Sequence, residues 1–253
     1  MLKIFLKNPF LQEVGATGSA VSRLTWQGRF NELDKILSSF LHEDSEILDV
    51  AVSTGVTSLD LYKNLRAADI KFQLSICDPW SKVYVSQTLL TSVRNEMGEF
   101  ILHYFGPLVF AKDLRCIWTI SKALGWICNY CCRNRAFGEQ RWLLDPSVRS
   151  ELGKNNLEWV TWDVFQGPLT KKFDLIRVMN LLNVRLFKEG EIIKCLSNIQ
   201  SSLKENGIFL VGQTNDAGQT HAGFYRKWGR GFKEVHSVNG GCPFASTINK
   251  LGQ

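Results

Sequence analysis

The sequence predicts an α/β fold built on a mostly parallel sheet of seven strands, with helices on both faces. Two observations support this: strand-like apolar runs alternate with helical patterns, and two strand-like runs close the chain. Alternating strands and helices form right-handed crossovers, which make neighbouring strands parallel. The closing pair is joined by a short glycine-rich turn, which favours an antiparallel C-terminal hairpin.

The first unit of the fold is predicted between residues 30 and 80. Its elements are, in order, a helix over residues 30–41, a strand over 46–52, a helix over 57–65 and a strand over 72–77. Ser53-Thr54-Gly55 forms the tight turn between the first strand and the second helix. Asp78-Pro79 ends the second strand, because proline stops the ladder, and it leaves a carboxylate at the C-terminal tip of the strand.

Residues 81–156 are predicted to form an inserted subdomain or lid within a single domain that spans residues 1–253. An ordinary crossover needs far fewer residues. The insertion shows a helix-like stretch, a hairpin-like run over residues 100–110 and an amphipathic segment over residues 116–133. The apolar face of this last segment has three possible uses, which are packing on the core, docking a partner subunit and lying on an acidic membrane surface.

Regular alternation resumes after the insertion. The predicted elements are strands over residues 157–163 and 173–179, a helix over 189–204, a strand over 208–212, and an antiparallel pair over 222–228 and 232–238. Glu205-Asn206-Gly207 provides the C-terminal stop of the long helix.

Composition limits the class of protein. The chain has 253 residues, of which 45% are hydrophobic and 21% charged, as in globular proteins that bury a large core. The most apolar region, residues 100–132, is interrupted by charged residues, so we expect no membrane-spanning segment. The first residues lack the apolar core and cleavage site of a secretory signal, which predicts a cytoplasmic protein.

The cysteines agree with that location. Their number is odd and they lie mostly within apolar runs, which is typical of reduced, buried thiols: Cys77, Cys116, Cys128, Cys131, Cys132, Cys195 and Cys242. Three of them are clustered at Cys128, Cys131 and Cys132, but a tetrahedral zinc site needs four ligands and no second pair has the required spacing. We therefore predict no metal site.

The net charge of +6 is unevenly distributed. Residues 110–150 contain seven Lys or Arg and three acidic residues, and residues 221–253 contain five and one. Such basic segments can attract an anionic partner such as nucleic acid, phosphate groups or acidic lipid, or they can be ordinary solvated faces.

Two features at the ends of neighbouring strands describe a nucleoside pocket. The turn Asp49-Val50-Ala51-Val52-Ser53-Thr54-Gly55 has small residues that let the backbone approach a ligand closely. Asp78, at the end of the next strand, can accept hydrogen bonds from both hydroxyls of a ribose. The turn lacks the glycines of a dinucleotide-binding motif, and the chain has neither a P-loop nor a nucleophile elbow, so a nucleoside without phosphates fits better.

These motifs resemble those of class I S-adenosylmethionine-dependent methyltransferases, which have a Rossmann-like sheet. The resemblance covers roughly residues 46–80 and 157–238 and includes Asp163 after the third strand. Ala51-Val52-Ser53-Thr54-Gly55 and the run from Phe173 to Asn180 are most similar to motifs of chemotaxis-receptor glutamate methyltransferases.

The resemblance implies S-adenosylmethionine as cofactor and a role for each matching residue. The turn would hold the amino acid part of the cofactor, Asp78 the ribose and Asp163 the adenine, while Met179 and Asn180 would face the methyl group. The implied cofactor-binding residues are Asp49, Ala51, Ser53, Thr54, Gly55, Asp78, Pro79, Asp163, Val164, Met179 and Asn180. Each of three polar residues also has a structural alternative: Asp49 can bond backbone amides, Asp163 can cap the next segment and Asn180 can cap a turn.

Methyl transfer is an in-line displacement that depends on alignment, so the protein needs a general base only when the acceptor is protonated. The candidate catalytic residues are Asn180 and, near the exit of the fifth strand, His221 and Tyr225; His103 in the insertion is a further candidate base. We thus expect S-adenosylmethionine-dependent methyl transfer to an unidentified acceptor, for which the basic segments suggest an anion. The alternatives are a non-catalytic cofactor-binding module and a nucleotide-sugar or nicotinamide enzyme on a similar sheet.

Overall fold

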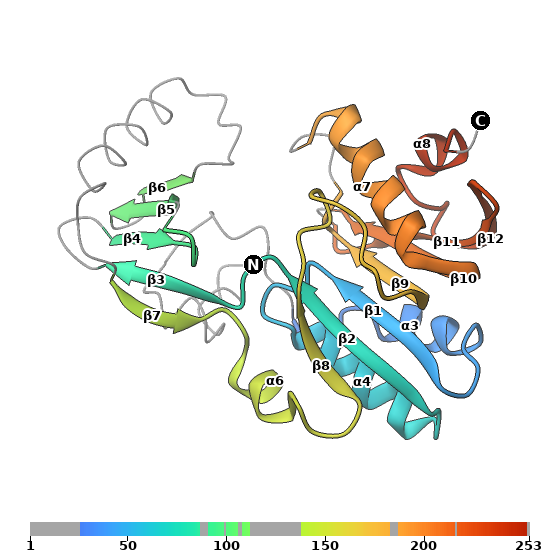
Figure 1. The fold of residues 1–253 in the computed structure, drawn as a ribbon, viewed down its shortest axis with the longest axis horizontal. Coiled ribbons are helices and arrows are strands. Elements are labelled where there is room, and N and C mark those ends of the chain that lie inside the picture. The colour runs from blue at the N-terminus through green and yellow to red at the C-terminus, as the bar shows by residue number, and fades with distance from the viewer. Residues whose placement is uncertain are drawn as a thin grey trace.

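The structure is a computed structural model that describes residues 26–86, 91–98, 100–105, 108–111, 138–182, 187–215 and 217–251. Its main element is a seven-stranded sheet with the order β12-β11-β10-β9-β1-β2-β8. The strands are β1 (Ser45–Val50), β2 (Phe72–Asp78), β8 (Leu157–Thr161), β9 (Phe173–Met179), β10 (Leu203–Thr214), β11 (Thr220–Trp228) and β12 (Gly231–Val238). The five strands from β8 to β10 are parallel, whereas β11 and β12 are antiparallel. The predicted Rossmann-like sheet with a C-terminal hairpin is confirmed (Figure 1).

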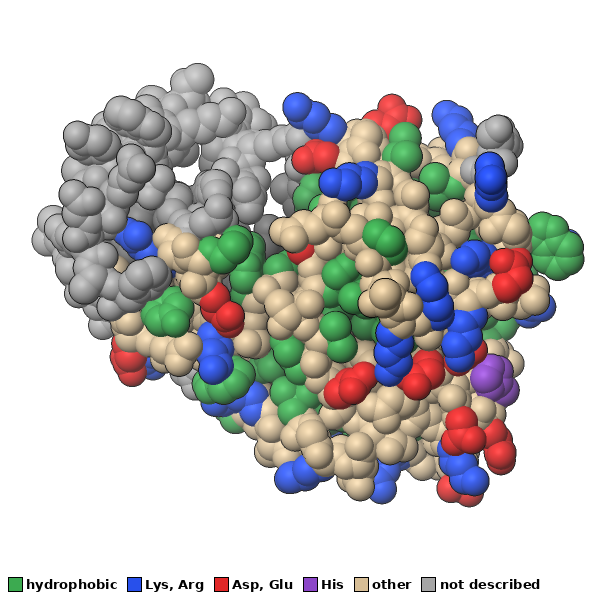
Figure 2. Space-filling view, in the orientation of Figure 1, with side chains coloured by type: hydrophobic (Ala, Val, Ile, Leu, Met, Phe, Trp, Pro, Cys, Tyr) green, Lys and Arg blue, Asp and Glu red, His purple; other side chains and the backbone are tan. Residues whose placement is uncertain are grey.

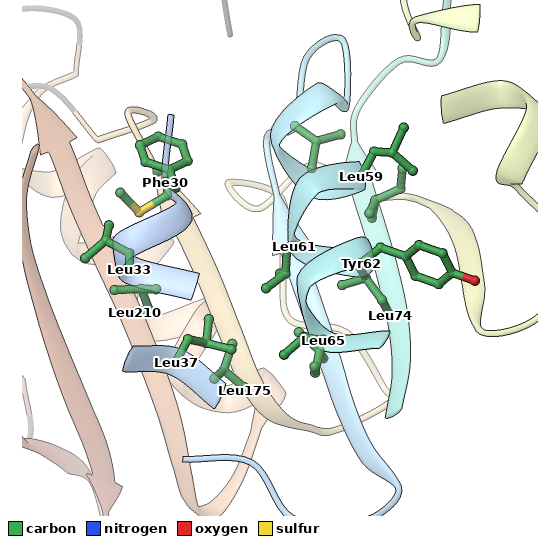
Figure 3. Close-up of a cluster of buried hydrophobic side chains, with 14 of the residues drawn as sticks. Phe30, Leu33, Leu37, Leu59, Leu61, Tyr62, Leu65, Leu74, Leu175 and Leu210 are labelled. Carbon is green, nitrogen blue, oxygen red and sulfur yellow. The ribbon is translucent and has the colours of Figure 1, made fainter. Parts of the chain in front are cut away.

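Helices cover both faces of this sheet because alternate residues of the buried strands point to opposite sides. On one face, α3 (Asn31–Ser38) and α4 (Val56–Ala67) pack against Ile47, Leu74 and Leu175. Figure 3 shows leucines of both helices directed at this part of the sheet. On the other face, α7 (Glu189–Ser202) and α8 (Ala245–Asn249) pack against strand residues that point to this side, such as Leu48, Ile176 and Phe209.

A second sheet lies in the chain between β2 and β8. Its five antiparallel strands have the order β6-β5-β4-β3-β7, and it is set beside the main sheet in Figure 1. The strands are β3 (Lys82–Ser86), β4 (Thr91–Arg94), β5 (Phe100–Phe105), β6 (Leu108–Ala111) and β7 (Glu139–Trp142). The chain returns to the main sheet through the short helix α6 (Pro146–Glu151). The expected hairpin over residues 100–110 is β5 and β6, while the amphipathic segment 116–133 and the cysteine cluster lie outside the described residues.

Two expectations about element boundaries were wrong. The helix-like stretch after Ser81 is instead strand β3, where buried Val83 and Val85 alternate with more exposed neighbours, as β-branched residues favour. Helix α7 ends at Ser202, two residues before its expected end, because Leu203 is buried and pairs with Phe173 as the first residue of β10. Among the described residues, no helix is both long and apolar enough to cross a membrane.

Candidate functional site

The predicted site residues gather at the carboxyl edge of the main sheet. The turn after β1 lies between the ends of β2 and β9, since β1 pairs with both strands. In the sheet, β2 and β8 lie on one side of β1, and β9 and β10 lie on its other side. The strand order therefore reverses between β1 and β9, and the turn after β1 lies at this point. Open α/β sheets bind ligands at such a point.

The turn after β1 has an unusual backbone. Ala51, Ser53 and Gly55 have φ angles of 59°, 55° and 77°, so every second residue is in the left-handed region. Side chains at Ala51 and Ser53 therefore cost strain of about 1–2 kcal/mol each, and small residues limit it. Gly55 precedes α4, and a Cβ atom there would lie 3.0 Å from Cγ1 of Val148 in α6.

Replacing Gly55 with alanine should lower the free energy of unfolding by about 1–3 kcal/mol, because the left-handed backbone and the contact with Val148 both oppose a side chain. Ser53→Gly is the matched control, since it removes left-handed strain at a half-buried position of the same turn. It should leave the stability unchanged or raise it by up to about 1 kcal/mol. Urea unfolding measures both; equal losses would show that the turn does not keep this conformation.

Asp78 lies against this turn. Its Oδ2 atom accepts a hydrogen bond of 3.1 Å from the backbone N–H of Ser53, and its side chain is half-buried. The backbone N–H of Val52 also donates to the carbonyl of Cys77, so the turn is tied to the end of β2. The structure thus places the carboxylate beside the tight backbone of the turn, as the nucleoside-pocket prediction requires.

Asp49 does not reach the surface of the turn. It is 3% exposed, and its two carboxylate oxygens accept bonds from Nε and Nη2 of Arg177 at 2.9 and 2.5 Å. The hydroxyl of Ser58 donates to the same carboxylate at 2.6 Å. The contacts of Asp49 therefore lie beneath the turn, and the hydrogen bonds that its carboxylate accepts come from side chains rather than from the backbone amides of its structural alternative.

Arg177 connects three elements below the site. Besides Asp49, it donates from Nη1 to Asp34 of α3 at 2.8 Å and from Nη2 to the carbonyl of Thr57 in α4 at 3.1 Å. We refer to Arg177, Asp49, Asp34 and Ser58 as the buried ion cluster. Burial alone would lower the pKa of Arg177, but attraction by Asp49 and Asp34 outweighs it and raises this pKa above its ordinary value. The arginine is thus a fixed cation.

Asp34 behaves differently from an ordinary salt-bridged carboxylate. Burial raises its pKa from 3.8 to about 6, an effect that Arg177 partly offsets and Asp49 reinforces. The raised pKa means that the folded protein retains a proton on Asp34 over a range of pH where the unfolded chain has lost it. The stabilisation that comes from this proton is complete at a pH below the pKa of Asp34 in the unfolded chain. It is lost as the pH rises through the pKa of Asp34 in the folded protein.

Asp34→Asn should therefore remove a pH dependence between about pH 4 and 7. Relative to the variant, the wild-type protein should lose about 1–3 kcal/mol of unfolding free energy across this window, the value expected for a shift of one to two pKa units. Urea unfolding at several pH values measures the difference between the two proteins. Parallel curves would show that Asp34 ionises with the same pKa in both states.

The tip of β9 and the segment after β8 complete this edge. Met179 is buried against Gly212, where a Cβ atom would lie 2.7 Å from its Cε. Asn180 has a φ of 58°, and its Oδ1 accepts a bond of 2.7 Å from the N–H of Thr214, so it joins the ends of β9 and β10.

In the segment after β8, Asp163 accepts a hydrogen bond of 2.9 Å from the N–H of Phe165 within a turn, and Val164 is buried beside α7. Asp163 thus has the local capping contact of its structural alternative, whereas the side chain of Asn180 links two strand ends.

The candidate bases are placed less favourably. His221 lies at this edge opposite Gln213, but its Nδ1 contacts the carbonyl of Asn239. Tyr225 pairs with Phe209 in the middle of β10 and is fully buried, which corrects the expectation that it lies near the exit of the fifth strand. Burial also raises the pKa of Tyr225, which disfavours a role as a base. His103 lies in β5, where the structure describes only the backbone.

Sequence reasoning missed the buried ion cluster. Its one signal was Arg177, a cation between the apolar pairs Leu175-Ile176 and Val178-Met179 of β9. The described part of the chain holds no group of three potential metal ligands, and the three cysteines it includes, Cys77, Cys195 and Cys242, are free and buried.

The fold and site define a Rossmann-like α/β protein with its candidate site at the carboxyl edge of the sheet. No family model and no curated protein matches the sequence. Solved structures similar to the chain include the N-methyltransferase NodS from Bradyrhizobium japonicum WM9 with S-adenosyl-l-homocysteine, at 14% identity and a TM-score of 0.37, covering 83% of this chain and 76% of that one. An S-adenosylmethionine-dependent methyltransferase from Clostridium acetobutylicum ATCC 824 has 13% identity and a TM-score of 0.36, with coverages of 85% and 74%. At such TM-scores these likenesses do not by themselves assign a function.

Proposed function

We propose that this chain binds S-adenosylmethionine at the carboxyl edge of the main sheet and transfers its methyl group to an acceptor. The observation that carries the proposal is the position of Asp78, whose carboxylate is bonded to Ser53 within the left-handed turn at the reversal of strand order. A carboxylate beside a tight backbone turn suits a ribose diol and a small polar group next to it.

The residues at this edge fit the chemistry of the cofactor. Asp78 and Pro79 would hold the ribose, and the turn from Ala51 to Gly55, including buried Thr54, would hold the amino acid part by close backbone approach. Asp163 and Val164 would border the adenine. Asp49 would act indirectly, because its contacts with Arg177 and Ser58 hold the turn from below.

The bound cofactor supplies an electrophilic methyl group on a sulfonium, and the chain has to align it with the acceptor. Met179 and Asn180 lie at the tip of β9 next to the turn and would border the reacting groups. Alignment of this kind contributes up to about 7–11 kcal/mol to lowering a barrier. Of the candidate bases, His221 lies at the same edge of the sheet, and it would remove a proton from the acceptor.

The inserted region 81–156 would shape the acceptor side. Its return segment is bonded to the turn, since the N–H of Asp145 donates to the carbonyl of Thr54 at 2.9 Å. Leu144 and Val148 also pack against Gly55. We infer that the insertion borders the candidate site, as a subdomain or lid would.

Calorimetry with S-adenosylmethionine, S-adenosylhomocysteine and NAD tests the proposal. We expect S-adenosylmethionine and S-adenosylhomocysteine each to bind with one-to-one stoichiometry, and we expect NAD not to bind. Failure of both to bind would refute the proposal, and binding of NAD alone would favour a nicotinamide enzyme. Formation of S-adenosylhomocysteine in the presence of an acceptor would then establish transfer.

A second candidate is a non-catalytic module that binds the cofactor. It is supported by the contact of His221 with Asn239 and by the burial of Tyr225, which engage or bury the two candidate bases whose side chains the structure describes. Binding without product formation across acceptors with hydroxyl, amine and carboxylate groups would favour it. A cytoplasmic location remains a prediction, to which the free thiols of Cys77, Cys195 and Cys242 lend support.

A further inference from the structure

The outer hairpin of the main sheet has an exposed basic surface that the proposed function does not use. Its residues are Arg226 and Trp228 of β11, Arg230 in the turn, and Lys233 of β12, which we call the basic hairpin surface. All four side chains are exposed, and the exposed fraction of Trp228 is 69%. Lys and Arg side chains are prominent at the corresponding right-hand end of the molecule in Figure 2.

The positive charges of this surface oppose each other. Arg226 and Lys233 are direct cross-strand partners, and like charges in that position destabilise a sheet. Among the residues that the structure describes, Arg226, Arg230 and Lys233 form no ion pair. Nearby Lys227, by contrast, donates to the carbonyls of Gln200 and Leu203.

Two acidic residues near this surface offset only part of its charge. Glu205 accepts a hydrogen bond from the N–H of Gly229 in the turn, so its carboxylate offsets at most one of the three positive charges. Glu234 is the partner of Tyr225, so it points to the opposite face of the hairpin from Lys233. The surface therefore retains an unfavourable concentration of positive charge, which an anionic partner would relieve.

Trp228 lies on the same face as Arg226, because residues two apart in a strand point the same way. Its cross-strand partner is Gly231, which has no side chain to cover the indole. An uncovered aromatic ring beside two cations is the arrangement with which proteins stack a base and hold the flanking phosphates. On β11 and β12 the other exposed large apolar side chain is Val235, at 37%, which is little apolar surface for entering a membrane.

We propose that the basic hairpin surface binds single-stranded nucleic acid, with Trp228 stacking on a base and Arg226, Arg230 and Lys233 holding phosphates. The turn of this hairpin is at the opposite edge of the sheet from the candidate site, since Thr220 at the start of β11 pairs with Thr214 and Trp228 ends the strand. The inference is therefore independent of cofactor binding.

Fluorescence anisotropy with labelled oligothymidylate and oligouridylate of about 15 nucleotides tests the proposal over a range of salt concentrations. Trp228→Ala should weaken binding about 5- to 100-fold through lost stacking. Arg226→Glu should weaken binding about tenfold or more and reduce the slope of log affinity against log salt by about one. The same substitution should raise the thermal midpoint or leave it unchanged, because an opposite-charge pair replaces a like-charge pair.

Lys63→Glu is the matched control, because Lys63 is an exposed cation on α4 and the charge change is identical. It should leave oligonucleotide binding within about twofold, since screening limits distant charges. Equal weakening by Lys63→Glu and Arg226→Glu would overturn the proposal, as would oligonucleotide binding that neither hairpin variant affects. Absence of oligonucleotide binding would also overturn it, and binding to vesicles of phosphatidylcholine and phosphatidylserine instead would assign the surface to acidic lipid.

Discussion

Replacing Arg177 with methionine is expected to lower the free energy of unfolding by about 3–5 kcal/mol, because the buried carboxylates of Asp34 and Asp49 lose their counter-ion. Arg177 is 1% exposed, so water cannot take its place at these groups without opening the core. A loss of this size is a large share of the total stability of a typical domain. Urea unfolding at about pH 8 measures it.

The loss should depend on pH. Without the arginine the two carboxylates repel each other, so the folded pKa of Asp34 rises further and the variant regains stability as the pH falls towards about 5. Adding Asp34→Asn and Asp49→Asn to the methionine variant should restore most of the lost stability, since no unpaired charge then remains buried. A loss below about 1 kcal/mol at pH 8, or no recovery in the triple variant, would contradict the role assigned to the buried ion cluster.

Most of the main sheet could be predicted because its strands are short apolar runs separated by turn residues. The predicted strand over residues 173–179 coincides with β9, and the C-terminal pair matches β11 and β12 within two residues. The second sheet was not predicted, since β3 pairs with β7 more than fifty residues later in the chain and the pairing has no local pattern. Sequence periodicity identifies the face of a strand but not its partner.

The same distinction applies to the site. The turn after β1 and Asp78 were found because each follows directly from a strand end. The contacts of Arg177 with Asp49 and Asp34 join residues 128 and 143 positions apart, which only the assembled sheet brings together. Tyr225 was misplaced because its depth depends on the register of β11 against β10. The closer likeness to chemotaxis-receptor methyltransferases stays a prediction.

Asp78→Ala is expected to weaken the binding of S-adenosylmethionine and S-adenosylhomocysteine at least about 100-fold. Hydrogen bonds to a charged group contribute about 1.5–3 kcal/mol each, and a ribose diol offers two of them. The substitution also removes the acceptor of the Ser53 N–H, so the turn loses one of its contacts with β2. Asp78→Asn retains an acceptor for Ser53 without the charge, and its loss of affinity should be about tenfold smaller.

Asp69→Asn is the control for this prediction, because Asp69 is exposed just before the amino end of the same strand and asparagine tolerates its φ of 55°. It should bind both compounds like the wild-type protein in calorimetry. The thermal midpoints of all three variants should be compared, so that lost binding is separated from lost folding. A folded Asp78→Ala variant with wild-type affinity would exclude Asp78 from the ribose site, and the adenosine would then have to lie elsewhere along the sheet edge.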